Sequence, residues 1–224
     1  MKIICQKINL LKSVNISLKA VPSKTTMPIL ECILIDATTN QIKFTTNDME
    51  LGIETIVDGI IEEKGIIALD AKIFYEIIRR LPDNTVTIKT DEKLTATITC
   101  EKANFTIPGK SGEDFAYLPL IEKEESLTIS QFTLKEMIRQ TIFSIASNET
   151  NKLMTGELFE IKNNYLKIVS LDGHRIAIRR MELKKDYADR KVVVPGKTLN
   201  EISKILSGEI DAVSYTHLRA HETD

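Results

Sequence analysis

An internal repeat constrains the fold of this chain more than any other feature of the sequence. A pattern of strand, amphipathic helix, three strands, strand and helix begins near the N-terminus and restarts about 124 residues later. Corresponding positions carry similar residues: Leu10, Val14 and Leu18 correspond to Leu134, Ile138 and Ile142, and Lys72, Glu76 and Ile77 correspond to Lys197, Glu201 and Ile202. This period is far longer than that of a solenoid. The sequence therefore predicts a duplicated α+β domain.

The repeat also predicts domain boundaries. The first domain covers 1–121, a linker rich in Pro, Gly and acidic residues ends with 122–126, and a second, incomplete domain covers 127–213. The tail, 214–224, has no counterpart in the first copy, and we expect it not to be native. Its His217 and His221 stand at i, i+4, a spacing found in metal sites, but no third ligand accompanies them, so no metal is expected.

The expected elements follow from hydrophobic periodicity and capping residues. Helices are predicted over 9–21, over 70–81 with Asp70 as N-cap, from Ser130 to Ala146, and over 197–206. Strands are predicted over 3–5, 29–36, 41–46, 51–57, 66–69, 85–90, 94–99, 104–107, 127–129, 154–161, 166–171, 176–178 and 192–194.

Composition excludes some function classes. The 30 basic and 32 acidic residues nearly balance, so any contact with an anionic partner must come from local segregation of charge. The three cysteines are far apart in the sequence and are expected as reduced core residues, not as a disulfide or metal set. No apolar run approaches the ~20 residues that span a bilayer. We therefore expect a soluble, cytoplasmic protein without a cofactor.

The stretch from Leu166 to Ile178 is the first candidate functional feature. Asp172-Gly173 predicts a hairpin turn, because Gly adopts positive φ without a Cβ clash. The turn presents His174 and Arg175 beside apolar neighbours, a combination suited to a small binding site. From these residues alone, a hairpin with a polar tip and no binding function remains the alternative.

Basic residues at same-face spacings on the four helices are the second candidate feature. The pairs are Lys12 and Lys19, Lys72 and Arg79, Lys135 and Arg139, and Lys197 and Lys204. One shared cationic surface would suit a phosphate backbone, which Lys and Arg bind without reading sequence. The alternative is ordinary solvated i, i+4 salt bridges, namely Lys72–Glu76 and Lys197–Glu201.

Several motifs in order give the chain a family resemblance. It resembles the bacterial DNA polymerase III beta subunits, the ring-shaped sliding clamps, through Met27-Pro28-Ile29-Leu30, Thr46-Asn47-Asp48-Met49-Glu50, the segment 70–82, Gly156-Glu157-Leu158-Phe159-Glu160, Asp172-Gly173-His174-Arg175 and Val192-Val193-Val194-Pro195. The resemblance implies duplicated clamp domains, with antiparallel sheets outside and two helices per domain on the inner face. The family has three such domains, so the resemblance implies that this chain is truncated after roughly two.

The resemblance also implies roles for individual residues. Duplex DNA would be lined by Lys24, Lys72, Arg79, Asn148, Lys152 and Lys197. A pocket for short peptides of the polymerase and clamp loader would be formed by Met154, Leu171, Gly173, His174, Arg175 and Ile176. The face that meets the partner in a head-to-tail homodimer would carry Lys102, Phe105 and Ile107.

The implied function is that of a non-catalytic processivity factor in DNA replication. It would encircle double-stranded DNA without sequence preference and tether replication and repair proteins. Two alternatives stay open: a static DNA-binding module, and a hydrolase that uses Asp172 and His174 as an acid–base pair. Against the hydrolase, the sequence shows no nucleophile motif, metal set or cofactor loop.

Overall fold

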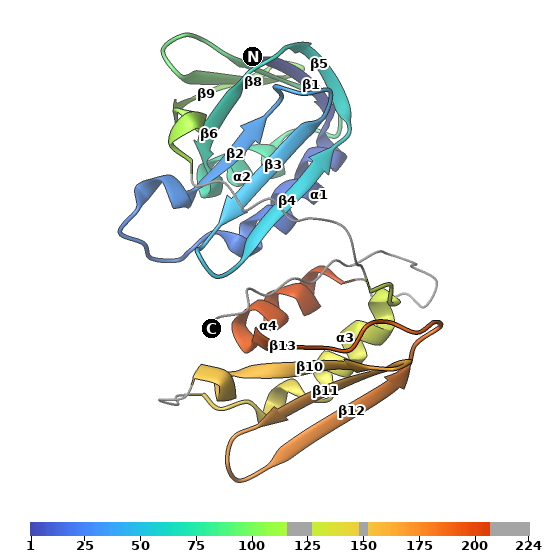
Figure 1. Ribbon diagram of the computed structural model, residues 1–224. Coiled ribbons are helices and arrows are strands. Elements are labelled where there is room, and N and C mark those ends of the chain that lie inside the picture. Colours follow the sequence, from blue (N-terminus) through green and yellow to red (C-terminus); the bar gives the residue numbers. More distant parts are fainter. Residues whose placement is uncertain (116–126, 148–151, 207–224) are drawn as a thin grey trace. The chain divides into compact units, whose positions relative to one another are not determined.

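A computed structural model describes residues 1–115, 127–147 and 152–206. The chain divides into two units, Met1–Pro119 and Leu120–Asp224. The predicted linker 122–126, Asn148 and the tail 214–224, with His217 and His221, lie outside the described residues. Each unit is built from antiparallel strands with two α-helices on one face of its sheet (Figure 1). No helix in the described parts is long and apolar enough to cross a membrane.

Unit 1 contains one nine-stranded antiparallel sheet. Its order is β4-β3-β2-β6-β9-β8-β7-β1-β5. The strands are β1 (Lys2–Gln6), β2 (Cys32–Asp36), β3 (Ile42–Asn47), β4 (Gly52–Val57), β5 (Gly59–Glu63), β6 (Ile66–Asp70), β7 (Thr85–Thr90), β8 (Thr95–Cys100) and β9 (Ala103–Lys110). Two half-sheets meet where β6 pairs with only the last residues of β9. The rest of β9 pairs with β8 alone, which leaves one edge of β9 open.

The helices of unit 1 seal the core against one face of this sheet. Helix α1 (Lys7–Ser17) packs on β3 and β4, and α2 (Ala71–Arg80) packs on β2 and β6. As predicted, Asp70 caps α2, because its Oδ1 accepts a hydrogen bond from the Ile73 backbone N–H at 2.8 Å. At the centre of the core, Phe44 and Phe74 meet edge to face with ring centroids 6.0 Å apart.

The described part of unit 2 is a four-stranded sheet with order β12-β11-β10-β13. Its strands are β10 (Gly156–Lys162), β11 (Tyr165–Leu171), β12 (Ile176–Glu182) and β13 (Arg190–Pro195), and its helices are α3 (Gln131–Arg139) and α4 (Gly196–Ile205). These strands repeat the order β4-β3-β2-β6 of unit 1. The core between sheet and helices includes Leu134, Ile138, Phe159, Ile168 and Leu199.

Several element predictions need correction. The helix predicted over 9–21 begins at Lys7 and ends at Ser17, before a 3₁₀ turn (Leu18–Ala20). The helix expected to reach Ala146 ends at Arg139, and the Thr141 hydroxyl satisfies the Met137 carbonyl that the helix end leaves free, donating to it at 2.8 Å. The strand expected from Ile29 begins at Cys32, after a 3₁₀ turn (Pro28–Glu31) that has Pro at its start. Residues 127–129 form no strand, and β5 was not predicted.

The three cysteines behave as expected. Cys5, Cys32 and Cys100 are all buried and unpaired. Burial raises the pKa of the Cys5 thiol to about 12, so this thiol stays protonated and unreactive at neutral pH.

Candidate functional site

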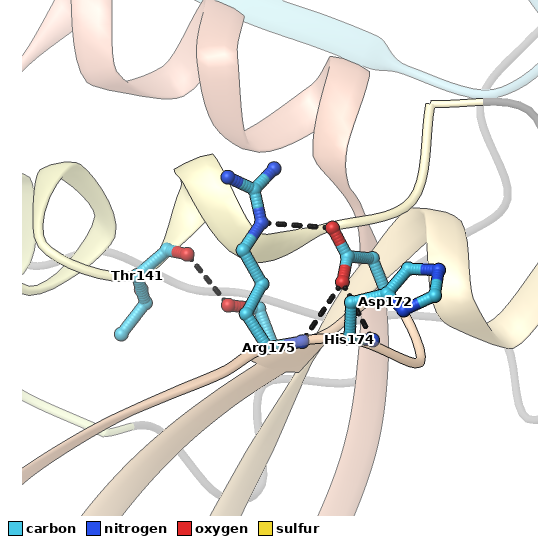
Figure 2. A network of polar contacts seen from close by, with 5 residues as sticks. Thr141, Asp172, His174 and Arg175 are labelled. Atoms are coloured by element: carbon cyan, nitrogen blue, oxygen red, sulfur yellow. Dashed lines mark hydrogen bonds and ion pairs between the residues drawn. The ribbon is translucent and has the colours of Figure 1, made fainter.

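The predicted hairpin exists, and its turn is organised by one carboxylate. Strands β11 and β12 pair in antiparallel register, with Leu171 opposite Ile176 and Val169 opposite Ile178. Between them, Asp172 Oδ1 accepts hydrogen bonds from the backbone N–H groups of His174 and Arg175, both at 3.1 Å (Figure 2). Gly173 adopts φ 86°, the left-handed conformation that the sequence predicted for this position.

Apolar side chains line the sheet face next to this turn. Paired residues of antiparallel strands point to the same side, so Leu171, Ile176, Val169 and Ile178 form one patch. Ile176 and Ile178 are 60% and 58% exposed. The opposite face is the core side, where Leu166, Ile168 and Ser170 are buried. The hairpin therefore offers apolar surface to solvent directly beside a polar tip.

Arg175 is held from two sides at the polar tip. Its Nε donates to Asp172 Oδ2 at 2.8 Å, and its guanidinium carbon lies 5.9 Å from the centroid of the Phe143 ring. Hydrogen bonds from the backbone of His174, and then those from Arg175, hold the pKa of Asp172 below its usual value. Asp172 is therefore an anion at neutral pH and anchors both the turn and the arginine.

The predicted pocket residues are only partly gathered. Leu171, Gly173, His174, Arg175 and Ile176 lie together at the end of the hairpin. Met154 lies on the 3₁₀ turn Lys152–Thr155 that leads into β10, the strand next to β11, and it is half-buried.

Phe143 was missed as a site residue. It lies on the 3₁₀ turn Ile142–Ser144 and is 58% exposed. A signal existed in the repeat, because the corresponding position in the first copy is Lys19. An aromatic residue at a position that is charged in the other copy indicates a role specific to unit 2.

The predicted acid–base pair is not formed. The Asp172 carboxylate contacts the backbone nitrogen of His174, and among the described residues it makes no hydrogen bond to the imidazole. No group of three or more metal-ligating side chains occurs in the described ranges. The geometry does not favour a hydrolase that uses Asp172 and His174.

A buried carboxylate lies in the core of unit 2. Glu157 of β10 is 0% exposed, and its carboxylate makes no well-formed hydrogen bond among the described residues, although the Thr141 side chain lies close enough to lower its pKa in part. Burial raises its pKa to about 7. The corresponding residue of unit 1 is Ile33, which is fully buried in an apolar core.

The predicted DNA-lining cations lie on exposed surfaces of both units. Lys24 is in the loop after α1, Lys72 and Arg79 are on α2, Lys152 precedes β10, and Lys197 is on α4, and all five are exposed. Within unit 1, α1 and α2 are neighbours, so Lys12, Lys72 and Arg79 belong to one helical layer.

Ion pairs on the helices differ from the i, i+4 pairs considered from the sequence. Glu76 pairs with Arg79 at 2.8 Å and with Arg80 at 3.2 Å, instead of with Lys72. On α4, Glu201 pairs with Lys204 at 2.6 Å. Lys135 donates to the Leu206 carbonyl at 3.0 Å, at the C-terminal end of α4. Solvent screens these surface pairs and makes them weak, so a phosphate can replace them at small cost.

One residue of the predicted dimer face, Phe105, lines an apolar groove in unit 1. Phe105 on the open edge of β9 is 40% exposed. It lines a cavity of about 320 Å³ with the α2 residues Lys72, Ile73, Glu76, Ile77 and Arg80. Lys102 is exposed, whereas Ile107 is 7% exposed and belongs to the core, so its side chain is not part of the surface. Lys72, predicted to line DNA, forms part of this groove.

Comparisons with family models and with known proteins point to the same family. The N-terminal domain of DNA polymerase III beta subunits matches residues 1–119, and the central domain of the same subunits matches residues 128–219. The beta sliding clamp of Bacillus subtilis is 36% identical over 222 residues, which cover 95% of this chain and 59% of that protein.

Solved structures show the same likeness. A chain from Eubacterium rectale described as a DNA polymerase III beta subunit is 69% identical, with a TM-score of 0.92, over 94% of this chain and 58% of its own length. The DNA polymerase sliding clamp of Bacillus subtilis superposes with a TM-score of 0.92 at 35% identity, over 100% of this chain and 60% of its own. The present chain thus spans less than two thirds of the length of each of these relatives.

The two sheet-and-helix units therefore define a protein of the sliding-clamp fold class. The chain belongs to the DNA polymerase III beta subunit family, because the family's N-terminal and central domains match successive parts of it. The predicted fold class, a duplicated clamp domain, is confirmed.

Proposed function

We propose that this chain is part of a DNA sliding clamp, a cytoplasmic, non-catalytic processivity factor of the bacterial replicative polymerase. The observation that carries the proposal is the match of two successive clamp domains, the second of which presents the apolar hairpin with its fixed arginine. The full-length protein would form a head-to-tail homodimeric ring around duplex DNA. The ring would encircle the duplex and so keep bound proteins on the DNA, and it would catalyse no reaction itself.

DNA contact would be made by the helix-borne cations and their neighbours. Exposed Lys and Arg release counterions from phosphates without reading bases, which is what a clamp that must slide requires. The residues proposed for this contact are the cations Lys24, Lys72, Arg79, Lys152 and Lys197, together with the neutral amide of Asn148. The weak surface pairs of Arg79 would exchange readily with phosphates.

Salt dependence and sequence preference test the DNA contact. Two duplex oligonucleotides of unrelated sequence should bind with equal affinity, and log K should fall linearly with log salt. Lys197→Ala should weaken both duplexes equally and should reduce the salt slope by about 1. A static DNA-binding module predicts instead a preference for one duplex, and the full-length protein would then stay on linear DNA with free ends. That result would reject the clamp.

Partner proteins would dock short peptides on the hairpin. Leu171, Ile176 and Met154 would receive apolar side chains, while Gly173, His174 and Arg175 would orient the peptide backbone. The expected partners are the replicative polymerase and the clamp loader.

A labelled short peptide with apolar anchor side chains tests the docking site by fluorescence anisotropy. Binding should saturate and should weaken on Arg175→Ala and on Met154→Ala. The matched control is Leu51→Ala, at the position of unit 1 that corresponds to Arg175, and it should leave binding unchanged. Peptide hydrolysis without saturable binding would favour an enzyme and would contradict the proposal.

The second copy of the chain would dock on the groove beside Phe105. An open strand edge next to an apolar cavity suits the addition of a partner strand, which supplies main-chain hydrogen bonds and apolar anchors. Phe105→Asp should abolish self-association of the full-length protein in sedimentation experiments, whereas Phe143→Asp in unit 2 should leave it intact.

A further inference from the structure

The sheet of unit 2 carries a group of basic side chains on the face away from α3 and α4. Lys167 of β11 pairs with Arg180 of β12 and with Glu160 of β10, and Glu160 also pairs with Lys191 of β13. Paired residues point to the same side of a sheet, and their neighbours along the strand point to the other. Phe159, next to Glu160, is buried in the core under the helices. These cations therefore form a cationic face on the opposite side of the sheet.

The cationic face is absent from the same place in unit 1. At seven corresponding positions, unit 2 has four cations and two carboxylates, whereas unit 1 has one cation and two carboxylates. The corresponding pairs are Asp36 and Glu160, Thr38 and Lys162, Gln41 and Tyr165, Lys43 and Lys167, Ile56 and Arg180, Asp58 and Glu182, and Ile66 and Lys191. The two units share the sheet, so the excess of positive charge in unit 2 is not required by the fold.

Glu160 holds two of these cations in place. Its carboxylate forms ion pairs with Lys167 and, at 2.9 Å, with Lys191. Hydrogen bonds from these two lysines lower the pKa of Glu160 to about 2, so it is an anion at neutral pH. The Glu160 side chain is 12% exposed, whereas those of Lys167 and Lys191 are 39% and 69% exposed. An ammonium group has three N–H donors, so each lysine can bind a phosphate oxygen while it stays paired with Glu160.

Arg180 and Tyr165 form a flat platform beside these lysines. The guanidinium carbon of Arg180 lies over the Tyr165 ring, 3.6 Å from its centroid. Arg180 is exposed, and in the part of the chain that the structure describes neither Arg180 nor Lys162 forms an ion pair. Nucleic-acid bases stack on aromatic rings and on guanidinium planes. A cavity of about 300 Å³ at this platform is lined by Glu160, Lys162, Asn163, Tyr165, Lys167 and Arg180.

We propose that the cationic face of unit 2 is a binding site for single-stranded nucleic acid. The lysines contact phosphates, and one base stacks on the guanidinium of Arg180. A second cavity of about 250 Å³ shares Glu160 and Lys162 with the first and extends to Lys191, which gives the strand room to continue. An acidic peptide matches the charges but makes no use of the platform, and the bases of a duplex are stacked on one another. The site goes beyond the proposed duplex contact, because the helix α4 that carries Lys197 covers the other face of this sheet.

A labelled short oligothymidine tests the site by fluorescence anisotropy on the full chain. The double variant Arg180→Ile with Lys191→Ile introduces the two residues that unit 1 has at these positions. It should weaken oligothymidine binding at least tenfold, and the slope of log K against log salt should fall by about 1.4, because each phosphate contact on a single strand contributes roughly 0.7. Binding of duplex DNA should not change. Lys197→Ala is the matched control, and it should weaken the duplex while it leaves the oligothymidine unaffected.

Tyr165→Gln tests the platform separately from the charges. It introduces the residue of unit 1 and removes no cation, so the salt slope should stay the same while oligothymidine binding weakens roughly tenfold through lost stacking. An oligoglutamate of the same length should bind far more weakly than the oligothymidine. Equal binding of the two oligomers, or full affinity in Tyr165→Gln, would show that this face selects charge alone and would overturn the inference.

The remaining outcomes separate this inference from the proposed function. If the wild-type chain does not bind the oligothymidine, or if the double variant weakens both nucleic acids alike, the single-strand site is overturned and the duplex contact stands on its own test. If the oligothymidine binds and the duplex does not, the proposed duplex contact fails and the inference stands. If the double variant lowers the melting temperature, Lys162→Thr at an exposed position decides, and an unchanged salt slope in this variant overturns the inference.

Discussion

The hairpins β3–β4 and β11–β12 have the same backbone turn but carry different side chains on one face of the sheet. Both use an Asp whose Oδ1 accepts two backbone N–H groups, and both place a positive φ at the next residue, 74° at Met49 and 86° at Gly173. The residues on the sheet face away from the helices differ, and two of those in unit 1, Thr45 and Asn47, are buried, whereas Ile176 and Ile178 in unit 2 are exposed. Asn47, Gly52, Thr45 and Glu54 in unit 1 correspond to Leu171, Ile176, Val169 and Ile178 in unit 2.

This difference is confined to one face of the hairpin. The turn bonds and the buried strand positions are shared, so they serve the fold. The polar-to-apolar change on one face, together with Leu51 against Arg175 and Lys19 against Phe143, is confined to unit 2. A surface that is apolar in one copy and polar in the other is not needed for folding, which favours a binding role for it.

The largest expected effect tests whether the two cores are equivalent. Phe44→Ala in unit 1 and Ile168→Ala in unit 2 change corresponding, fully buried residues. The first should cost about 3–5 kcal/mol of unfolding free energy and the second about 2–5, because each leaves a cavity. Denaturant unfolding followed by a probe in each unit measures both. A negligible loss at either position would show that the cores are not equivalent.

Much of this fold could be predicted from the sequence, because the duplication gives positions in one unit a corresponding position in the other, and the two residues can be compared. The helix over 70–81 and the turn at Asp172-Gly173 carry local signals, a capping carboxylate and a glycine, and both predictions were confirmed. The early end of α3 was not predictable by periodicity, because Ile138 and Ile142 continue the helical spacing of apolar residues beyond Arg139. The Phe105 groove likewise depends on how an edge strand lies against α2, which sequence spacing does not encode.

The next effect concerns the core position where Ile33 and Glu157 correspond. The pKa of Glu157 is raised from 4.5 to about 7 by burial. The folded state therefore retains a proton that the unfolded state releases, and this contribution to stability is complete below pH 4.5 and declines as the pH rises toward 7. Integrated over that interval, the loss is about 3 kcal/mol.

Glu157→Ile introduces the residue that unit 1 has at this position, and it should remove this pH dependence of the unfolding free energy. The unfolding free energy of unit 2 should increase by roughly 3 kcal/mol at pH 8, and it should change much less at pH 4.5. Urea unfolding at several pH values measures the slope. The control is Glu201→Gln on α4, where a partly exposed surface carboxylate is replaced and little change is expected. An unchanged slope in Glu157→Ile would mean that Glu157 does not titrate there.

A smaller effect separates the two hairpin faces. Leu171→Asn introduces the residue that unit 1 has at this position. It should weaken the anchor peptide by roughly tenfold to a hundredfold, because burial of a Leu-sized side chain is worth about 1.5–3 kcal/mol. The mirror change, Asn47→Leu on unit 1, should create no peptide binding, because unit 1 has Leu51 where unit 2 has Arg175. Equal binding by wild type and Leu171→Asn would show that the peptide docks elsewhere.

The smallest effect concerns the turn residues with positive φ. No atom lies within 4 Å of the position that a Cβ would take at Gly173, so Gly173→Ala meets no steric obstacle. Its cost is then the backbone preference alone, about 1 kcal/mol of unit 2 stability. Met49 already bears this cost in unit 1, so Met49→Gly should stabilise that unit, by less than 1 kcal/mol, since Gly also gains freedom in the unfolded chain. Thermal unfolding measures both. If Gly173→Ala destabilises unit 2 and Met49→Gly stabilises unit 1, the two turns are equivalent in energy as well as in hydrogen bonding. If both variants destabilise, Met49 makes contacts that outweigh its strained φ.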